Sequence, residues 1–65
     1  MKTYYVLLVK HSSNDKWSDA FGDYDKEAVK KEAEDSYMYS YETKIIKILD
    51  SQVLIDAEIA RLNSL

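Results

Sequence analysis

Residues 3–9, "TYYVLLV", are the most apolar segment of the chain. It is a continuous run of aromatic, β-branched and aliphatic residues, without the polar residue at every second position that marks a half-exposed strand. Such a run is typical of a strand that is buried on both faces. We therefore predict that residues 3–9 form the central strand of a sheet.

The segments that follow predict a hairpin with this strand. Residues 11–15, "HSSND", are rich in side chains that hydrogen-bond to nearby backbone groups in turns. Beyond them, Trp17, Asp19 and Phe21 share one face of an extended segment. This spacing predicts a second strand with Trp17 and Phe21 on the core side and Asp19 at the solvent margin.

A helix is predicted from Asp25 to about Ser36. The Asp25 carboxylate is placed to accept hydrogen bonds from the free backbone amides of the first turn, and good helix formers follow it. Val29, Ala33 and Tyr37 recur every fourth residue. This narrow apolar stripe predicts that the helix packs on the sheet with one face.

The β-branched content of "TKIIKIL", residues 43–49, predicts a third strand. A right-handed crossover through the helix places this strand beside the first one. The predicted fold class is α+β: a three-stranded antiparallel sheet with ββαβ connectivity, strand order 3-1-2 and one helix on the sheet. Residues 1–49 form this core of a single small domain that spans residues 1–65.

Residues 50–65 are predicted to form a C-terminal helix that Asp50 or Ser51 caps and that ends near Asn63. Its apolar residues lie on two faces instead of one. A helix that is apolar on two sides needs more than one neighbour, so we expect it to contact a second copy of the protein. The predicted oligomer interface is Ile55, Ile59 and Leu62, and the other apolar face is Val53, Ala57 and Ala60.

The composition favours self-association for the same reason. A chain of 65 residues buries only about 60% of the surface that its unfolded form exposes, and one core of this size rarely supplies more than about 3–5 kcal/mol. Cysteine is absent, which excludes disulfides and thiolate metal sites. No apolar run approaches the ~20 residues that cross a bilayer, and the first apolar stretch is too short for a signal peptide. We expect a cytoplasmic protein without a membrane partner.

The charge of the chain is unevenly distributed. Residues 15–42 carry nine acidic and four basic side chains, a balance of −5, whereas the rest of the chain carries three acidic and five basic ones, a balance of +2. The acidic middle disfavours direct binding of nucleic acid through this segment.

The stretch "WSDAFGDYDKEA", residues 17–28, holds the only Trp, Phe and Gly of the chain. In a structural interpretation, Trp17 and Phe21 anchor the second strand and Gly22 allows a backbone bend. In a functional interpretation, the acidic and aromatic side chains contact a basic protein surface. The predicted partner-binding residues are Trp17, Asp19, Asp23 and Tyr24. The spacing of the acidic residues does not match a calcium loop, so no metal is expected.

A second candidate site combines tyrosines with lysines. Tyrosine rings can stack on bases and lysines can hold phosphate, which predicts an oligomeric sponge that sequesters a nucleotide signal between subunits. Sheet packing for the tyrosines and protection of the sheet edge by the lysines are the structural alternatives. The residues of this alternative ligand site are Tyr37, Tyr39, Tyr41, Lys10, Lys44 and Lys47.

Catalytic chemistry has little support in the sequence. His11 is the only histidine, and Ser12 and Ser13 are adjacent to it in a turn instead of facing it across a cleft. The chain has no phosphate-binding loop, no dinucleotide motif and no histidine-rich metal pattern. We expect a non-enzymatic protein without a cofactor.

The motif W-x-x-x-F-G-D-Y-D, which runs from Trp17 to Asp25, resembles one found in a group of small uncharacterised phage and prophage proteins. The resemblance extends over about residues 4–49 and includes "KIIKIL". It implies a protein of a mobile element, in the cytoplasm of the host cell, where small acidic proteins often block host machinery. The predicted function is inhibition of a host protein, including a defence system. The alternatives are the nucleotide sponge and an acidic DNA mimic built on residues 15–42.

Overall fold

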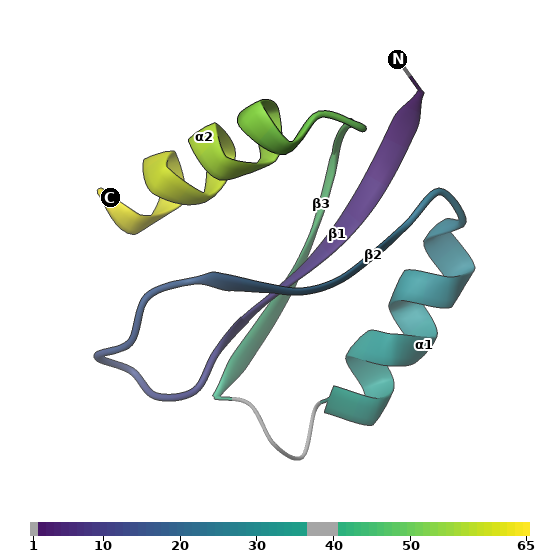
Figure 1. Cartoon of the computed structure of the whole chain (residues 1–65). Coiled ribbons are helices and arrows are strands. Elements are labelled where there is room, and N and C mark those ends of the chain that lie inside the picture. The colour runs from purple at the N-terminus through teal and green to yellow at the C-terminus, as the bar shows by residue number, and fades with distance from the viewer. Residues whose placement is uncertain (1, 37–40) are drawn as a thin grey trace.

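The computed structural model describes residues 2–36 and 41–65. Two strands, a helix, a third strand and a second helix follow one another, so the ββαβ connectivity and the C-terminal helix are confirmed (Figure 1). The elements are β1 (Thr3–Lys10), β2 (Ser18–Asp23), α1 (Lys26–Ser36), β3 (Glu42–Leu49) and α2 (Gln52–Asn63). In this part of the chain, neither helix has the length and apolar character to cross a membrane.

The three strands form one antiparallel sheet in the order β2-β1-β3, so the prediction that residues 3–9 form the central strand is confirmed. Residues 6–9 of β1 are all buried, and the side chains of Leu7 and Leu8 are 0% exposed. Consecutive buried side chains point to opposite faces of a strand. Both faces of the sheet must therefore be covered.

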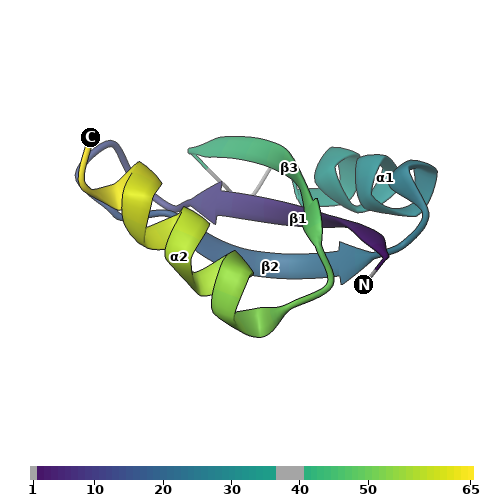
Figure 2. The ribbon, with the colours of Figure 1, turned by 90° about the horizontal axis from the view of Figure 1, so that it is seen from above.

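The two helices cover these two faces, so the molecule has three layers (Figure 2). On the α1 side, Leu7 and Val9 pack against Val29 of α1. On the α2 side, Val6 and Leu8 pack in a cluster with residues of β3 and α2. The other buried members of that cluster are Trp17, Ile46, Ile55 and Leu62.

A bulge in β2 overturns one prediction. Leu7 pairs with Phe21, but Leu8 pairs with Asp19, which makes Ala20 an extra residue in β2. One extra residue reverses the alternation of side chains along the rest of the strand. Trp17 accordingly packs on the α2 side, whereas Phe21 packs on the α1 side. The prediction that these two aromatic residues share one face is wrong.

The first helix begins as the sequence predicts. The Asp25 carboxylate accepts a hydrogen bond from the backbone N–H of Glu27 at 3.0 Å, which caps the first turn. Val29 is fully buried and Ala33 is partly buried against the sheet. Tyr37, the third member of the predicted stripe, lies outside the described residues.

The second helix corrects the predicted oligomer interface. Ser51 caps α2, because its Oγ accepts from the backbone N–H of Leu54 at 3.5 Å. Ile55 and Leu62 are buried against the sheet of the same chain, and Ile59 packs beside them. Ile55 and Leu62 cannot also form an exposed interface, so the assignment of these two residues to a subunit contact is wrong. Ile59 is partly buried in the same chain. The reason is that the sheet face opposite α1 is free within one chain, and the connection of two residues after β3 lets α2 fold back onto it.

Asn63, at the end of α2, fastens this helix to the start of β2. Its Oδ1 accepts from the backbone N–H of Trp17 at 2.7 Å, and its Nδ2 donates to the carbonyl oxygen of Trp17 at 3.2 Å. One side chain thereby satisfies both backbone groups of a buried residue, just before β2 begins. These contacts join positions that are 46 residues apart.

Asn63→Ala is expected to lower the free energy of unfolding by roughly 1–2 kcal/mol, because both backbone groups of Trp17 lose their partner in a partly buried site. Urea denaturation measures the loss. Asn14→Ala, in the exposed turn between β1 and β2, is the matched control and is expected to change stability little. Equal losses for the two variants would contradict the role of Asn63.

Candidate functional site

The site begins with a close contact between Tyr4 and Gly22. A Cβ atom at Gly22 would lie 2.6 Å from Tyr4 Oη and 2.7 Å from Tyr4 Cε2, so the tyrosine ring occupies the space that a side chain at this position would need. No glycine or other described residue has a positive φ angle. Gly22 therefore allows the approach of a ring, and the prediction that it allows a backbone bend is wrong.

Tyr4 is held by a short chain of contacts. Its ring meets Tyr24 edge to face, with 4.8 Å between centroids and 72° between planes. The Tyr24 hydroxyl donates to Asp50 Oδ2 at 3.0 Å, and Asp50 Oδ1 accepts from the backbone N–H of Lys2 at 3.1 Å. These contacts join the start of β1, the segment before α1 and the connection between β3 and α2.

Two adjoining hollows lie beside this chain of contacts, between β2 and the N-terminal half of α2. Their volumes are about 170 Å³ and about 300 Å³, and Tyr4, Gln52 and Ile55 line both of them. We call the two hollows together the β2 groove. The first is also lined by Val6, Asp19, Ala20, Phe21 and Gly22, and the second by Tyr24 and Asp50.

The chemistry of the β2 groove suits a cation. It contains the carboxylates of Asp19 and Asp50 and the rings of Tyr4 and Tyr24, and no lysine or arginine is among the described residues that line it. A guanidinium or ammonium group can pair with carboxylates and stack on tyrosine rings. A phosphate group would meet two negative charges there. The groove therefore matches lysine or arginine side chains.

The hydrogen bond between Tyr24 and Asp50 shifts the pKa of both groups. It is the main cause that holds the pKa of the Asp50 carboxyl below its ordinary value, and it raises the pKa of the Tyr24 phenol. A neutral phenol beside a carboxylate is the form that this contact favours. Asp50 therefore keeps its negative charge in the groove at neutral pH.

Tyr24→Phe is expected to lower stability at pH 7 and to have a smaller effect in acid. Because the pKa of Asp50 is lower in the folded state, the contact stabilises the protein above the ordinary carboxyl pKa of about 3.9 and fades as pH falls through the folded-state value. The raised phenol pKa limits the same contribution at the alkaline end, where it fades as pH rises through the folded-state value.

Urea midpoints of the wild type and Tyr24→Phe at pH 7 and near pH 2.5 measure this prediction. Tyr41→Phe is the matched control, because Tyr41 is an exposed tyrosine and the hydroxyl that donates to Asp50 belongs to Tyr24. A difference between Tyr24→Phe and the wild type that is as large in acid as at pH 7 would contradict the contact with ionised Asp50.

The structure brings together only part of the predicted partner-binding set. Asp19 and Tyr24 both line the β2 groove. Trp17 is 9% exposed and belongs to the core on the α2 side, so its assignment to partner binding is wrong. Asp23 pairs with Tyr5 and does not line the groove, and its Oδ1 accepts from the backbone N–H of Asp25 at 2.8 Å.

The predicted phosphate site of three lysines does not form. Lys44 pairs with Leu8 and lies on the α2 side, whereas Lys47 pairs with Tyr5 on the opposite face of the sheet. The Lys10 ammonium lies 4.9 Å from the centroid of the Trp17 ring. The lysines therefore do not converge on one anion.

The tyrosine part of that alternative stays a prediction. Tyr37 and Tyr39 lie outside the described residues. Tyr41 is 62% exposed, and its backbone N–H donates to the carbonyl oxygen of Lys10 at 2.7 Å, which continues the pairing of β1 with β3. Tyr41 thus lies beside the last residue of β1, where the turn to β2 begins, and it does not line the β2 groove.

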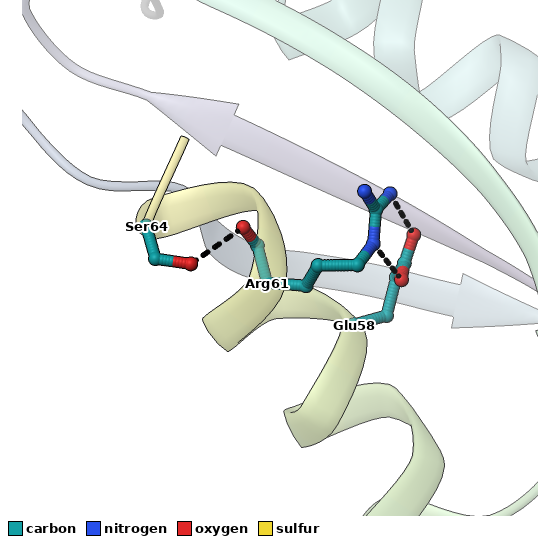
Figure 3. A network of polar contacts seen from close by, with 3 residues as sticks. All are labelled: Glu58, Arg61 and Ser64. Carbon is teal, nitrogen blue, oxygen red and sulfur yellow. Dashed lines mark hydrogen bonds and ion pairs between the residues drawn. The ribbon is translucent and has the colours of Figure 1, made fainter.

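A separate polar network lies at the end of α2 (Figure 3). The Arg61 guanidinium donates through Nε and Nη2 to the two carboxylate oxygens of Glu58, both at 2.8 Å. Ser64 Oγ donates to the carbonyl oxygen of Arg61 at 2.9 Å. The hydrogen bonds from Arg61 hold the pKa of the Glu58 carboxyl below its ordinary value. This network orders the last turn of the helix and takes no part in the groove.

Among the polar residues that line the groove, three are not identified as site residues by the sequence: Tyr4, Asp50 and Gln52. The sequence predicts Tyr4 only as part of the central strand and Asp50 only as a candidate helix cap, and it indicates no site role for Gln52. Alternation from Val6 places Tyr4 on the same face as Val6, and this is the one signal that could have found it. Nothing local indicates that Tyr24 and Asp50 meet.

Comparisons with known proteins identify no relative of the chain. No family model, no curated protein and no solved structure matches the chain. Among residues 2–36 and 41–65, no three histidine, aspartate or glutamate side chains gather where they could hold a metal ion. The resemblance to phage proteins therefore stays a prediction.

Proposed function

We propose that the protein is a non-enzymatic binding protein that takes a basic segment of a partner protein in the β2 groove. The observation that carries the proposal is the lining of this groove: two carboxylates, two tyrosine rings and no described cationic side chain. Electrostatic complementarity of this kind speeds association and selects partners of the opposite charge.

The proposed biological role is inhibition of a host protein by a phage-encoded partner, with defence systems among the targets. The resemblance of the segment from Trp17 to Asp25 to small phage proteins supports this role. The groove supports it as well, because it lies at an outer strand of the sheet, where a large partner can approach. Occupying a basic surface of the target would keep that surface from its normal ligand.

Asp19→Lys tests this proposal. The probe is a peptide of about eight residues in which arginine and threonine alternate, and calorimetry measures its binding at low salt. Reversing the charge at one wall of the groove is expected to weaken binding about tenfold, which corresponds to ~1.4 kcal/mol. The effect is expected to shrink as salt screens the charges.

Glu34→Lys is the matched control, because it makes the same charge change on the exposed side of α1, outside the groove. It is expected to retain most of the wild-type affinity. An equal loss for both variants would show that only net charge matters, and unchanged binding of Asp19→Lys would contradict the proposal. A peptide of alternating glutamate and threonine is expected not to bind.

A further inference from the structure

The β2 groove adjoins a free strand edge. In the order β2-β1-β3, β2 has β1 on one side and no described strand on the other. Four consecutive residues of β2, Asp19 to Gly22, form a wall of the first hollow. A ligand in the groove therefore lies next to backbone N–H and C=O groups that are not used by β1. An outer strand of this kind can pair with a segment of another chain.

The charges select this edge over the opposite one. The other outer strand, β3, carries Lys44 and Lys47, one on each face of the sheet, and both are exposed. Lysines at an outer strand oppose pairing with a basic segment. On β2, Asp19 lies on the α2 side and Asp23 on the α1 side, so an added basic strand would meet a carboxylate on either face.

The bulge shapes which part of β2 can pair. Ala20 interrupts the regular register with β1, and bulges at outer strands discourage long, regular pairing between copies of the same chain. Phe21, Gly22 and Asp23 pair with β1 without further interruption. This part of β2 lies beside Tyr4, so a short added strand there keeps alternate side chains within reach of the groove.

We propose that the basic segment binds as an extended strand added to the free edge of β2, with every second side chain, an arginine or lysine, entering the β2 groove. This inference rests on the proposed function, because it specifies how the same groove is used. The added strand supplies affinity through backbone hydrogen bonds, and the groove selects basic side chains at alternate positions.

Backbone methylation of the probe tests the inference without changing its charge. Two versions of the alternating arginine and threonine peptide carry N-methyl groups, one on the arginine amides and the other on the threonine amides. A strand pairs through only one of these two sets. We expect one version to lose at least tenfold in affinity and the other to bind like the parent.

Amide NMR spectra of the full chain give a second readout. Adding the parent peptide is expected to slow hydrogen exchange at backbone amides of β2, from Ser18 to Asp23, and to leave those of β3 unchanged. Equal binding of both methylated peptides, or protection at β3 instead of β2, would overturn strand addition. The proposed function would still stand if binding remained sensitive to Asp19→Lys, and absence of any binding by the parent peptide would overturn both.

Discussion

Leu8→Ala is expected to leave most of the protein unfolded at 25 °C. Leu8 is 0% exposed and packs in the cluster that joins β1, β3 and α2. Removing a buried leucine side chain typically costs about 2–5 kcal/mol, through lost burial and the cavity that remains. Because one core of this size rarely supplies more than about 3–5 kcal/mol in total, the loss approaches the whole stability. Far-UV circular dichroism during urea denaturation measures it.

Val53→Ala is the matched control for this prediction. Val53 is an aliphatic residue of α2 that is 76% exposed, so its truncation is expected to shift the urea midpoint little. A midpoint for Leu8→Ala that is close to the wild-type value would contradict the position of Leu8 beneath α2. It would indicate that the helix does not cover this face of the sheet in solution.

Gly22→Val is expected to lower the free energy of unfolding by about 1–3 kcal/mol. The new side chain needs the space that the Tyr4 ring occupies, with atoms as close as 2.6 Å to its Cβ. Tyr4 would have to leave its contact with Tyr24, so the change is also expected to distort the β2 groove. Urea denaturation measures the stability, and binding of the basic peptide measures the groove.

Measuring the stability change of Gly22→Val in a variant without the Tyr4 ring tests whether the clash with this ring causes the loss. Glycine weakens a strand relative to residues with a side chain, so Gly22→Val is expected to stabilise the protein once the ring is gone. Tyr4→Ala supplies that background, and a double-mutant cycle measures the coupling between the two positions. An equal loss with and without the Tyr4 ring would contradict the steric explanation.

The three-layer arrangement explains how so short a chain can form a groove at all. The central strand β1 has buried side chains on both faces, α1 covers one face and α2 the other. The first hollow, between β2 and the start of α2, is bordered by Gly22 and by Ala20 of the bulge. Positions with little side chain leave space there, and Tyr4 fills only part of it.

Local chemistry was enough for the prediction of the elements. The apolar run of residues 3–9 identified the central strand, because a strand without alternating polar residues needs cover on both faces. Asp25 indicated the start of the first helix and the pair Asp50 and Ser51 that of the second, because side chains of this kind accept hydrogen bonds from amides two or three residues away. The structure shows these contacts for Asp25 and Ser51. These signals act within one turn or one strand, and so they can be read from neighbouring residues.

Contacts between distant segments determine on which face of the sheet the side chains of β2 and α2 pack. The bulge at Ala20 placed Trp17 and Phe21 on opposite faces, and it arises from the pairing of β2 with β1 instead of from the residues of β2 alone. Ile55 and Leu62 pack on the otherwise uncovered face of their own sheet. Their spacing on the helix would suit a contact with a second subunit equally well. Such choices depend on which surfaces remain uncovered after the other elements have packed.

The candidate site likewise combines residues that local sequence indicates with residues that only tertiary contacts bring in. The residue types alone indicate an acidic and aromatic segment, with Asp19 and Tyr24, after the central strand. Tyr4 and Asp50 join them in one groove through tertiary contacts, across separations in the chain that no local pattern spans. Composition and spacing limit what a segment can contact, whereas the packing of strands and helices selects the partners that it does contact.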